Sequence, residues 1–437
     1  MSRAARVVEA DALDFAQYVR PGDLVAWGQC GAEPCTLTMR LMAQRQAIAA
    51  QGGGGGRFRV FIGASWSGTL EPAHADVVDF LAYGAAGTNR RLERAGVLDI
   101  LPCHYSQFRE AFTHGPNRVD VLLLQVAPAD EAGRYSLSIA HEYLVPLIET
   151  ARVVIAEVNA AAPWTYGERM LRAEDFDVLV HTERMPLEAP VAQAGEAEAR
   201  IAARVASHVA GLVEDGSTLQ LGLGALPEAI AARLADRRDL GVHTGTIGDA
   251  LAGLMEAGVV TNARKTRDAG VSVAGTMMGT RRVYEFAHRN AQVQFRSTAY
   301  THDIGVLGSI DRFVAINSAL EVDLTGQMNA EVAAGRYVGA VGGALDFMRG
   351  AARSRGGMAV VALASRARHG SRIVARLSGP VSTPRGDAAV IVTEHGVADL
   401  RGLTLAQRVE RMLAIAPAEC REALAAEYHA QRDTLAA

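Results

Sequence analysis

The chain has 437 residues, a length that predicts two or three domains. Hydrophobic residues make up 49% and charged residues 21%, as in globular proteins with a sizeable core. The formal net charge of −4 argues against a nucleic-acid binder, which would carry a basic excess or a basic stripe. The four cysteines are scattered and form no Cys-x-x-Cys pair, and the histidines lack metal-ligand spacing. We therefore expect neither a disulfide framework nor a metal site.

The N-terminal stretch MSRAARVVEADALDF carries acidic residues early and contains no long apolar run. No stretch of 18 apolar residues occurs elsewhere in the sequence. These features predict a cytoplasmic protein with no signal peptide and no membrane span.

Short apolar and β-branched runs alternate with longer segments rich in Ala, Leu, Glu and Arg, a pattern typical of an α/β fold. In chain order, strands are predicted at 23–28, 57–64, 119–127, 152–159, 177–182, 217–224, 270–276, 303–309, 358–364 and 388–394. Helices fit between them, including 198–214 and 225–236. The strands are apolar on both faces, which predicts parallel sheets with helices on both sides.

The chain contains two segments built to one plan, at 21–41 and 215–234. Each has an apolar strand, a glycine turn, a proline and then a helix. A stretch rich in Pro, Ala and Glu at 186–197 separates the two halves and is predicted to be a linker. The sequence therefore predicts two similar α/β domains, at 1–190 and 195–437.

Two glycine turns are candidates for ligand binding. In LGLGALPEAI, Gly222 and Gly224 follow a strand and precede a helix, which exposes backbone N–H groups to an anion. A lone Gly-x-Gly is more commonly a tight structural turn. The second turn, in VGGALDFMRGAARSRGG, precedes three arginines that suit a phosphate ligand, although a solvated helix face explains them equally well. The sequence contains neither a P-loop nor a Gly-x-Ser-x-Gly motif, so both of those chemistries are excluded.

Several long segments in the same order resemble the acetyl-CoA hydrolase/transferase family, and within it the 4-hydroxybutyrate CoA-transferase-like branch. The resemblance covers nearly the whole chain. The segments that carry it are PGDLVAWGQCGAEP (21–34), VAPADEAGRYSLS (126–138), EVNAAAPWTYGE (157–168), HTGTIGDALAGLMEAGVVTNARKT (243–266), INSALEVDLTGQMNAE (316–331), VGGALDFMRGAARSRGG (341–357) and VTEHGVADLRGLT (392–404).

The resemblance implies two related open α/β domains with the active site in the cleft between them. It also implies ping-pong transfer of CoA between short carboxylic acids such as 4-hydroxybutyrate, succinate or itaconate, through a glutamyl-CoA intermediate. CoA would be a substrate, no cofactor would be bound permanently, and a homodimer is expected. Gly222 and Gly224 match one family glycine turn, which stabilises oxyanions. Val341, Gly342 and Gly343 match the second turn, which lies against the CoA thioester.

The sequence departs from the family at the residue that performs the covalent step. The resemblance places the nucleophilic glutamate directly after a His-Thr pair, where this chain has Gly245. A glycine can neither attack a thioester nor form an anhydride. A second departure is Ala344, where many members have Gln.

Another carboxylate must then replace the missing one, or the chain has lost catalysis. Glu33, Glu321 and Glu394 match positions that the family carries alongside its usual nucleophile, so structural roles are expected for them. Glu71, in SWSGTLEP, lies just beyond the carboxyl end of a predicted strand, where open α/β sheets place ligand residues. Glu71 is therefore the predicted nucleophile, and Cys30 is expected to be a small buried residue. Two alternatives stay open: an acyl-CoA hydrolase on the same scaffold, and a silent acyl-CoA-binding protein.

Overall fold

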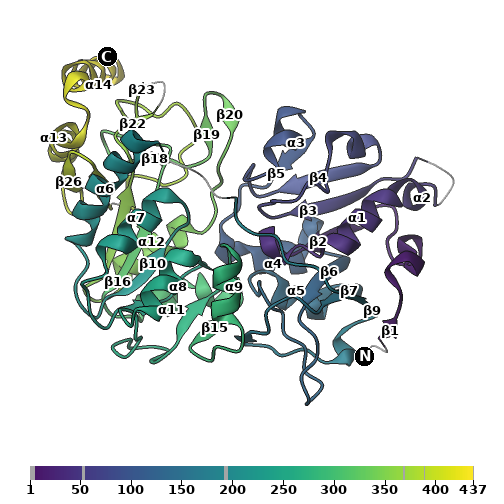
Figure 1. Cartoon of the computed structure of the whole chain (residues 1–437). Coiled ribbons are helices and arrows are strands. Elements are labelled where there is room, and N and C mark those ends of the chain that lie inside the picture. Colours follow the sequence, from purple (N-terminus) through teal and green to yellow (C-terminus); the bar gives the residue numbers. More distant parts are fainter. Residues whose placement is uncertain (1–4, 52–54, 191–194, 368–369, 388, 437) are drawn as a thin grey trace. The chain divides into compact units, whose positions relative to one another are not determined.

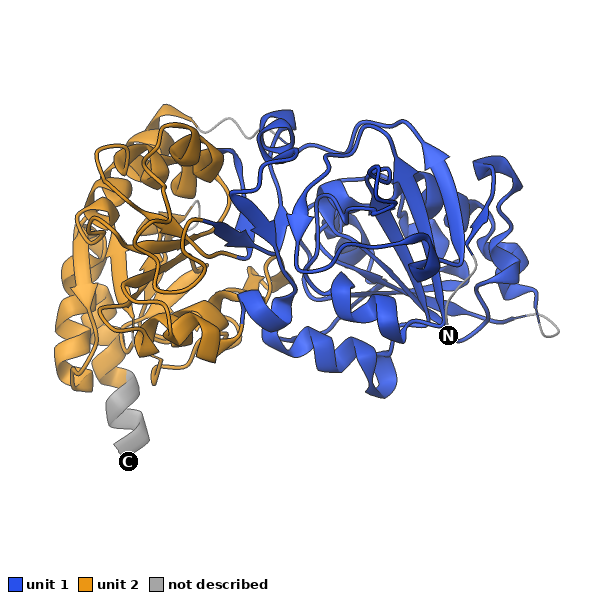
Figure 2. Cartoon of the chain, turned by 90° about the horizontal axis from the view of Figure 1, so that it is seen from below, with its two compact units in different colours: residues 1–190, 245–249, 271–302 blue, residues 191–244, 250–270, 303–437 orange. Residues whose placement is uncertain are grey.

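The computed structural model describes residues 5–51, 55–190, 195–367, 370–387 and 389–436. Part of the predicted linker, 191–194, lies outside these residues. The chain forms two compact units, coloured separately in Figure 2. Unit 1 comprises 1–190, 245–249 and 271–302; unit 2 comprises 191–244, 250–270 and 303–437.

Unit 1 is built on an eight-stranded, fully parallel sheet in the order β1-β9-β7-β6-β2-β3-β4-β5 (Figure 1). All residues of β2, β6 and β7 are buried, as expected for parallel strands covered on both faces. The strands are β1 (Arg6–Val7), β2 (Leu24–Trp27), β3 (Phe58–Ile62), β4 (Val78–Ala82), β5 (Leu98–Ile100), β6 (Val121–Val126), β7 (Val153–Asn159) and β9 (Val178–Thr182).

The strand order of this sheet reverses between β2 and β6. From β2 the chain steps outward through β3, β4 and β5, and then returns to place β6 on the other side of β2. In open α/β sheets such a reversal leaves a crevice beyond the carboxyl ends of the two strands, where ligands bind. The segments that follow β2 and β6 are therefore the first place to look for a site in unit 1.

Short helices and two small sheets complete unit 1. The helices are α1 (Cys35–Ala43), α2 (Arg45–Ala49), α3 (Arg90–Arg94), α4 (Phe108–Thr113), α5 (Leu144–Thr150), α9 (Arg281–Ala287) and α10 (Thr298–Thr301). One small sheet joins β8 (Tyr166–Gly167), β15 (Val293–Phe295) and β13 (Ser272–Ala274), and the other joins β12 (Thr246–Ile247) to β14 (Thr276–Met277). Because β15 pairs with β8, the segment 271–302 packs with the first half of the chain. The predicted second domain, 195–437, is for this reason not one continuous unit.

Unit 2 contains a six-stranded sheet in the order β11-β10-β16-β21-β25-β26, parallel except for β26. Its strands are β10 (Thr218–Leu221), β11 (Gly241–Val242), β16 (Phe313–Asn317), β21 (Met358–Ala362), β25 (Val390–Thr393) and β26 (Gly396–Asp399). Its helices are α6 (Glu196–Ala210), α7 (Ala225–Arg233), α8 (Asp249–Glu256, whose first residue counts with unit 1), α11 (Ile304–Gly308), α12 (Ala344–Arg353), α13 (Leu405–Ile415) and α14 (Arg421–Ala436). Short strands complete it: β17 (Glu321–Asp323), β18 (Met328–Asn329), β24 (Ile373–Val374), β19 (Val332–Ala333), β20 (Arg336–Tyr337), β22 (Arg366–Ala367) and β23 (Gly370–Ser371).

The predicted α/β class with parallel sheets is confirmed, and every predicted strand but one overlaps an observed strand. The exception is 303–309, which forms the helix α11. The Asp303 side chain accepts a 2.7 Å hydrogen bond from the backbone N–H of Val306, which caps this helix. The two segments built to one plan do form strand, turn and helix, as β2 with α1 and β10 with α7. No helix within the described ranges is both long and apolar enough to cross a membrane.

Candidate active site

Polar side chains follow four strands of the unit 1 sheet, β2, β4, β5 and β6, and meet beyond the carboxyl edge. Gln29 comes after β2, Tyr83 directly after β4 and Tyr105 after β5, while Glu142 lies in the segment between β6 and α5. We call these four residues the carboxyl-edge cluster. Gln29 and Glu142 come from the two strands between which the strand order reverses. The cluster therefore occupies the position where α/β sheets bind ligands.

Gln29 holds the cluster together, because all of its amide hydrogen-bonding groups are used. Its Oε1 accepts from the backbone N–H of Ala64 at 3.0 Å and from the Tyr83 hydroxyl at 2.8 Å. Its Nε2 donates to the Tyr105 hydroxyl at 3.2 Å and to Oε2 of Glu142 at 2.5 Å. The N–H of Ala64 can only donate, so the orientation of the amide is fixed and Nε2 must face Glu142.

Glu142 is a fully buried carboxylic acid that is only half satisfied. Its relative exposure is 2%, and its Oε1 is buried with no hydrogen-bond partner. Burial raises the pKa of Glu142 from 4.5 to about 8, and the hydrogen bond from Gln29 partly opposes that rise. No other carboxylate oxygen among the described residues is buried without a partner. Such an atom requires an explanation, because buried polar groups are otherwise nearly always paired.

The surroundings of Glu142 are uncharged at neutral pH. Burial raises the pKa of the Tyr83, Tyr105 and Tyr143 hydroxyls, so these groups keep their protons. Burial likewise lowers the pKa of His302, whose ring is stacked on Tyr105 with centroids 5.0 Å apart, to about 3. A charge formed on Glu142 would thus lie in a region of low polarity with no cation beside it, which explains the direction of its pKa shift.

The backbone around the cluster is strained. Three non-glycine residues in these segments have positive φ angles: Cys30 at 52°, Ser138 at 59° and Glu142 at 26°. Such conformations cost about 1–3 kcal/mol each and concentrate at active sites and ligand clamps. Here they fall within the two segments that follow β2 and β6. The strain therefore marks the same place as the buried carboxylic acid.

Glu142 and residue 245 both lie beside Gly275. A Cβ placed on Gly275 would be 3.0 Å from the carbonyl oxygen of Gly245 and 3.5 Å from Cγ of Glu142. The N–H groups of Gly275 and Thr276 donate to that Gly245 oxygen at 3.0 and 3.1 Å, and the N–H of Glu142 donates to the Gly275 oxygen at 3.3 Å. Gly275 thus connects Glu142 to the position where the family resemblance expects a glutamate.

The predicted nucleophile Glu71 lies at the end of the loop that follows β3, as the sequence indicated. Its side chain is exposed, and its backbone N–H donates to Nδ1 of His74 at 3.2 Å, where it precedes the 3-10 helix Pro72–Asp76. The loop starts in a buried environment, where Ser67 donates to Glu33 at 3.0 Å. Glu71 is not among the residues that hydrogen-bond within the carboxyl-edge cluster.

The carboxylates expected to be structural have fixed partners. Glu33 accepts from Thr38 and Ser67, Glu321 from Ser378 and Asn329, and Glu394 from Ser365. Cys30 is buried, and burial raises the pKa of its thiol, so it is a neutral small residue as predicted. No group of three or more potential ligands suitable for a metal ion occurs in the part of the chain that the structure describes.

The two predicted glycine turns both lie beyond the carboxyl edge of the unit 2 sheet. Gly222 and Gly224 follow β10, and Gly224 precedes α7 with a φ of 111°. Gly343 directly precedes α12, a helix that packs on β16 and β21 and leads back to the start of β21. Because β21 is parallel to β10, the N-terminus of α12 must lie at the carboxyl edge. At the same edge Asn317 donates to Oε1 of Gln220 at 3.0 Å.

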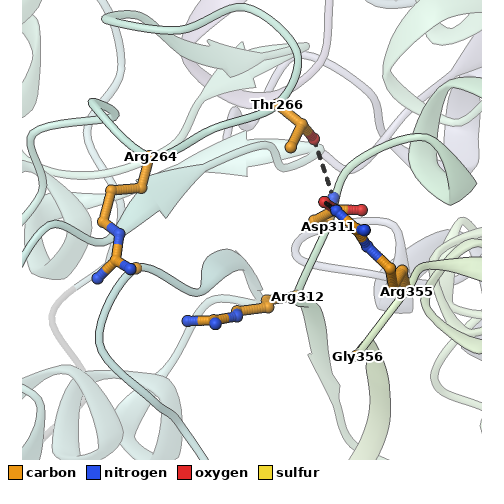
Figure 3. A pocket seen from close by; sticks show the side chains of 7 residues that line it. Arg264, Thr266, Asp311, Arg312, Arg355 and Gly356 are labelled. Carbon is orange, nitrogen blue, oxygen red and sulfur yellow. Dashed lines mark hydrogen bonds and ion pairs between the residues drawn. The ribbon is translucent and has the colours of Figure 1, made fainter.

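The three arginines after the second glycine turn do not gather beside that turn, as a phosphate-binding group would. Arg349 forms two 3.0 Å hydrogen bonds with Asp387, and Arg353 lies at the far end of the ten-residue α12, about 15 Å along the helix. Arg355 pairs with Asp311 in a pocket of about 510 Å³, where Thr266 also contacts Asp311 (Figure 3).

This arginine-lined pocket lies at the opposite edge of the unit 2 sheet. Gly216, Arg312 and Gly356, which line it, precede β10, β16 and β21, so the pocket is at the amino ends of those strands. Of the two interpretations of the arginines, the geometry favours a solvated surface for Arg349, Arg353 and Arg355.

Two family models match this chain, one in each half. The acetyl-CoA hydrolase/transferase N-terminal domain matches residues 6–189, and the C-terminal domain of the same family matches residues 279–428. The 4-hydroxybutyrate coenzyme A transferase of Clostridium kluyveri is 37% identical over 351 residues, which cover 79% of this chain and 81% of that protein. The chain belongs to the acetyl-CoA hydrolase/transferase family.

Two further relatives match almost the whole length of this chain. The butyryl-CoA:acetate CoA-transferase of Anaerostipes caccae is 32% identical over 93% of both chains. The crystal structure of RipA from Yersinia pestis is 30% identical, covers 98% of both chains and has a TM-score of 0.90. The predicted family and its two-domain architecture are therefore confirmed.

The sequence interpretation missed the carboxyl-edge cluster. The strand before Tyr83, β4, was not predicted, and Glu142 follows β6 only after a long segment. The sequence did carry one signal for this cluster: polar residues occur in the segments that follow the apolar strands, as Gln29 does after LVAWG.

Proposed function

We propose that this chain transfers CoA between an acyl-CoA and a short-chain carboxylate, by a ping-pong reaction through an acyl anhydride and a glutamyl-CoA thioester. The observation that carries the proposal is the match of both family domains, in order, to relatives that are named CoA-transferases. A carboxylate nucleophile suits this chemistry, because the anhydride keeps the acyl group activated until CoA returns. Acids of the 4-hydroxybutyrate, succinate or itaconate type are the proposed substrates.

The proposed roles of the glycine turns follow from their backbone. Gly222 and Gly224 would stabilise the oxyanion of each tetrahedral intermediate, and Val341, Gly342 and Gly343 would contact the thioester end of CoA. Both turns precede helices at the carboxyl edge of one sheet, which supports these roles. No permanently bound cofactor is part of the proposal.

The proposed nucleophile must be a carboxylate of this chain other than residue 245, which is glycine. Glu71 remains the sequence-based proposal, supported by its position after β3 and by the small residues of its loop. Its exposed side chain is open to a ligand from solvent. Replacement with alanine would abolish transfer if Glu71 forms the intermediate.

Transfer is favoured over hydrolysis because the relatives from Clostridium kluyveri and Anaerostipes caccae are named transferases. The test is a coupled assay that measures acetyl-CoA formed from butyryl-CoA and acetate, separately from the free CoA that hydrolysis releases. Transfer without free CoA supports the proposal. Free CoA alone would indicate a hydrolase, and binding without either product would indicate a silent acyl-CoA-binding protein. A cytoplasmic homodimer is proposed from the resemblance and can be tested by light scattering.

A further inference from the structure

Two further features of unit 1 occur at the place where its strand order reverses. The segments after β2 and β6 supply Gln29 and Glu142, which meet through a 2.5 Å hydrogen bond. Positive φ angles occur at Cys30, Ser138 and Glu142 in the same two segments. A topological crevice and stored backbone strain both point to a ligand site.

One carboxylate oxygen of Glu142 is held by a hydrogen bond, and the other is left available to a ligand. Its Oε2 is bound by Nε2 of Gln29, whose orientation is fixed by the N–H of Ala64 and the hydroxyl of Tyr83. Its Oε1 is buried and has no partner. A carboxylate with one oxygen anchored and the other free is oriented for reaction at the free oxygen.

The other buried glutamates provide a comparison within the same chain. In Glu157, Oε1 accepts from the hydroxyls of Thr36 and Thr182, and Oε2 accepts from the N–H of Thr36. In Glu394, Ser365 donates to both oxygens. These carboxylates are saturated and serve to connect elements. Among the carboxylates of the described residues, only Glu142 has a buried oxygen without a partner.

We propose that Glu142 is the nucleophile of CoA transfer, with its Oε1 forming the acyl anhydride and then the glutamyl-CoA thioester. The inference rests on the proposed function and replaces Glu71 with a residue that the sequence alone did not single out. The position of Glu142 agrees with it, because Glu142 and Gly245 both hydrogen-bond to the backbone of Gly275, so the reacting carboxylate lies in the region where the family expects one.

The chemistry balances without any further reactant. Oε1 attacks the thioester carbonyl carbon, a C–O bond forms, and the C–S bond breaks to release CoA thiolate. The thiolate attacks the Glu142 carbonyl of the anhydride, which frees the first acid and leaves glutamyl-CoA. The acceptor carboxylate then attacks the carbonyl of glutamyl-CoA, which forms a second anhydride and releases the thiolate. The thiolate attacks the acceptor's carbonyl in this anhydride, which gives the new acyl-CoA and regenerates the Glu142 carboxylate.

The protonation state of Glu142 gives the proposal a pH signature. The groups that face it are Cys30, Tyr83, Tyr105 and Tyr143, all held neutral by pKa values raised through burial. The guanidinium of Arg296 lies over the Tyr300 ring at 4.3 Å. Only the ionised form attacks, so with a pKa of about 8 the transfer rate rises with pH up to about 8.

Trapping the intermediate identifies the nucleophile directly. The protein is incubated with butyryl-CoA, the thioester is reduced with borohydride to an alcohol, and tryptic peptides are sequenced by mass spectrometry. Trypsin separates the candidates, because Glu142 lies in 135–152 and Glu71 in 60–90. We expect the alcohol at Glu142. An adduct forms only where the thioester can reach the carboxylate. The experiment therefore also tests whether the buried Oε1 of Glu142 becomes accessible to the substrate.

Two outcomes overturn the inference in different ways. If the wild type transfers CoA and the adduct lies on 60–90 or another peptide, Glu142 is not the nucleophile and the proposed function stands. If the wild type transfers nothing across a panel of short acyl-CoA donors and carboxylate acceptors, the proposed function fails and this inference fails with it.

Variants provide the second measurement. Glu142→Gln keeps the acceptor for Gln29 and should lower transfer about 1,000-fold or more, with unchanged CoA affinity. Glu142→Asp withdraws the oxygen and should lower transfer about 100-fold. The matched control is Glu149→Gln on the same peptide, an exposed residue paired with Arg169, which should leave transfer unchanged. Wild-type transfer by a folded Glu142→Gln protein would overturn the inference.

Discussion

The side-chain amide of Gln29 donates a 2.5 Å hydrogen bond to Oε2 of Glu142, and the two residues follow the strands between which the sheet order of unit 1 reverses. This bond is the one interaction that lowers the pKa of Glu142 against the effect of burial. It therefore controls how much of the acid is ionised near neutral pH. The same bond leaves Oε1 as the free oxygen.

Replacing Gln29 with leucine should raise the pKa of Glu142 further. The ionised acid would lose its only hydrogen-bond donor while its burial stayed the same. We expect the pH profile of kcat/KM to move up by about one unit, with transfer at pH 7 about tenfold slower. Gln46→Leu, which removes an exposed glutamine bound to Asp76, is the control and should leave the profile in place. An unshifted profile in Gln29→Leu would contradict a role for this hydrogen bond.

The buried acid also makes the stability of the fold depend on pH. Because the pKa of Glu142 rises from 4.5 to about 8 on folding, the folded chain holds a proton that the unfolded chain has released in this range. The contribution of Glu142 to the free energy of unfolding is therefore fully present below pH 4.5. It decreases as the pH rises toward 8, by about 5 kcal/mol at most.

The Glu142→Gln variant isolates this effect, because glutamine does not titrate. We expect the stability of the wild type relative to the variant to fall as the pH is raised from 5 to 8, measured by urea unfolding at each pH. A constant difference across this range would show that Glu142 is ionised in the folded protein at pH 5.

The fold was largely predictable from sequence because parallel strands that are buried on both faces appear as continuous apolar runs, as in VLLLQV of β6. The segment 303–309 resembles a strand in sequence because its apolar run is too short to show helical periodicity, whereas in the structure Asp303 caps a helix there. The candidate site was less predictable. Glu142 becomes notable only when the sheet order brings the segment after β6 next to Gln29, and no local pattern encodes that order.

Gly275 lies beside both the Gly245 oxygen and the side chain of Glu142. A Cβ at this position would make a tight 3.0 Å contact with the Gly245 oxygen and an ordinary 3.5 Å contact with Cγ of Glu142, so Gly275→Ala should shift the backbone at Gly245. We expect kcat/KM for transfer to fall about tenfold or more and the protein to lose about 1–2 kcal/mol of stability. Gly386→Ala is the control, since a Cβ there would meet nothing within 4 Å. Equal kinetics of the two variants would show that the packing between Gly275 and Gly245 does not limit transfer.

The proposed contact of CoA with the second glycine turn can be tested with two glycines that both precede helices of unit 2. Gly343 precedes α12 in the turn proposed to bind the thioester end of CoA, whereas the exposed Gly195 precedes α6. Valine at either position loses a favoured helix cap, so both variants should lose about 1 kcal/mol of stability. Only Gly343→Val places a branched side chain where the pantetheine would pass. We expect its CoA affinity, measured by titration calorimetry, to fall at least about tenfold.

Gly195→Val should bind CoA as the wild type does, because no heavy atom lies within 4 Å of its added Cβ. Equal affinities in the two variants would remove Val341, Gly342 and Gly343 from the proposed CoA site and leave the assignment of Glu142 to be judged by its trapped adduct.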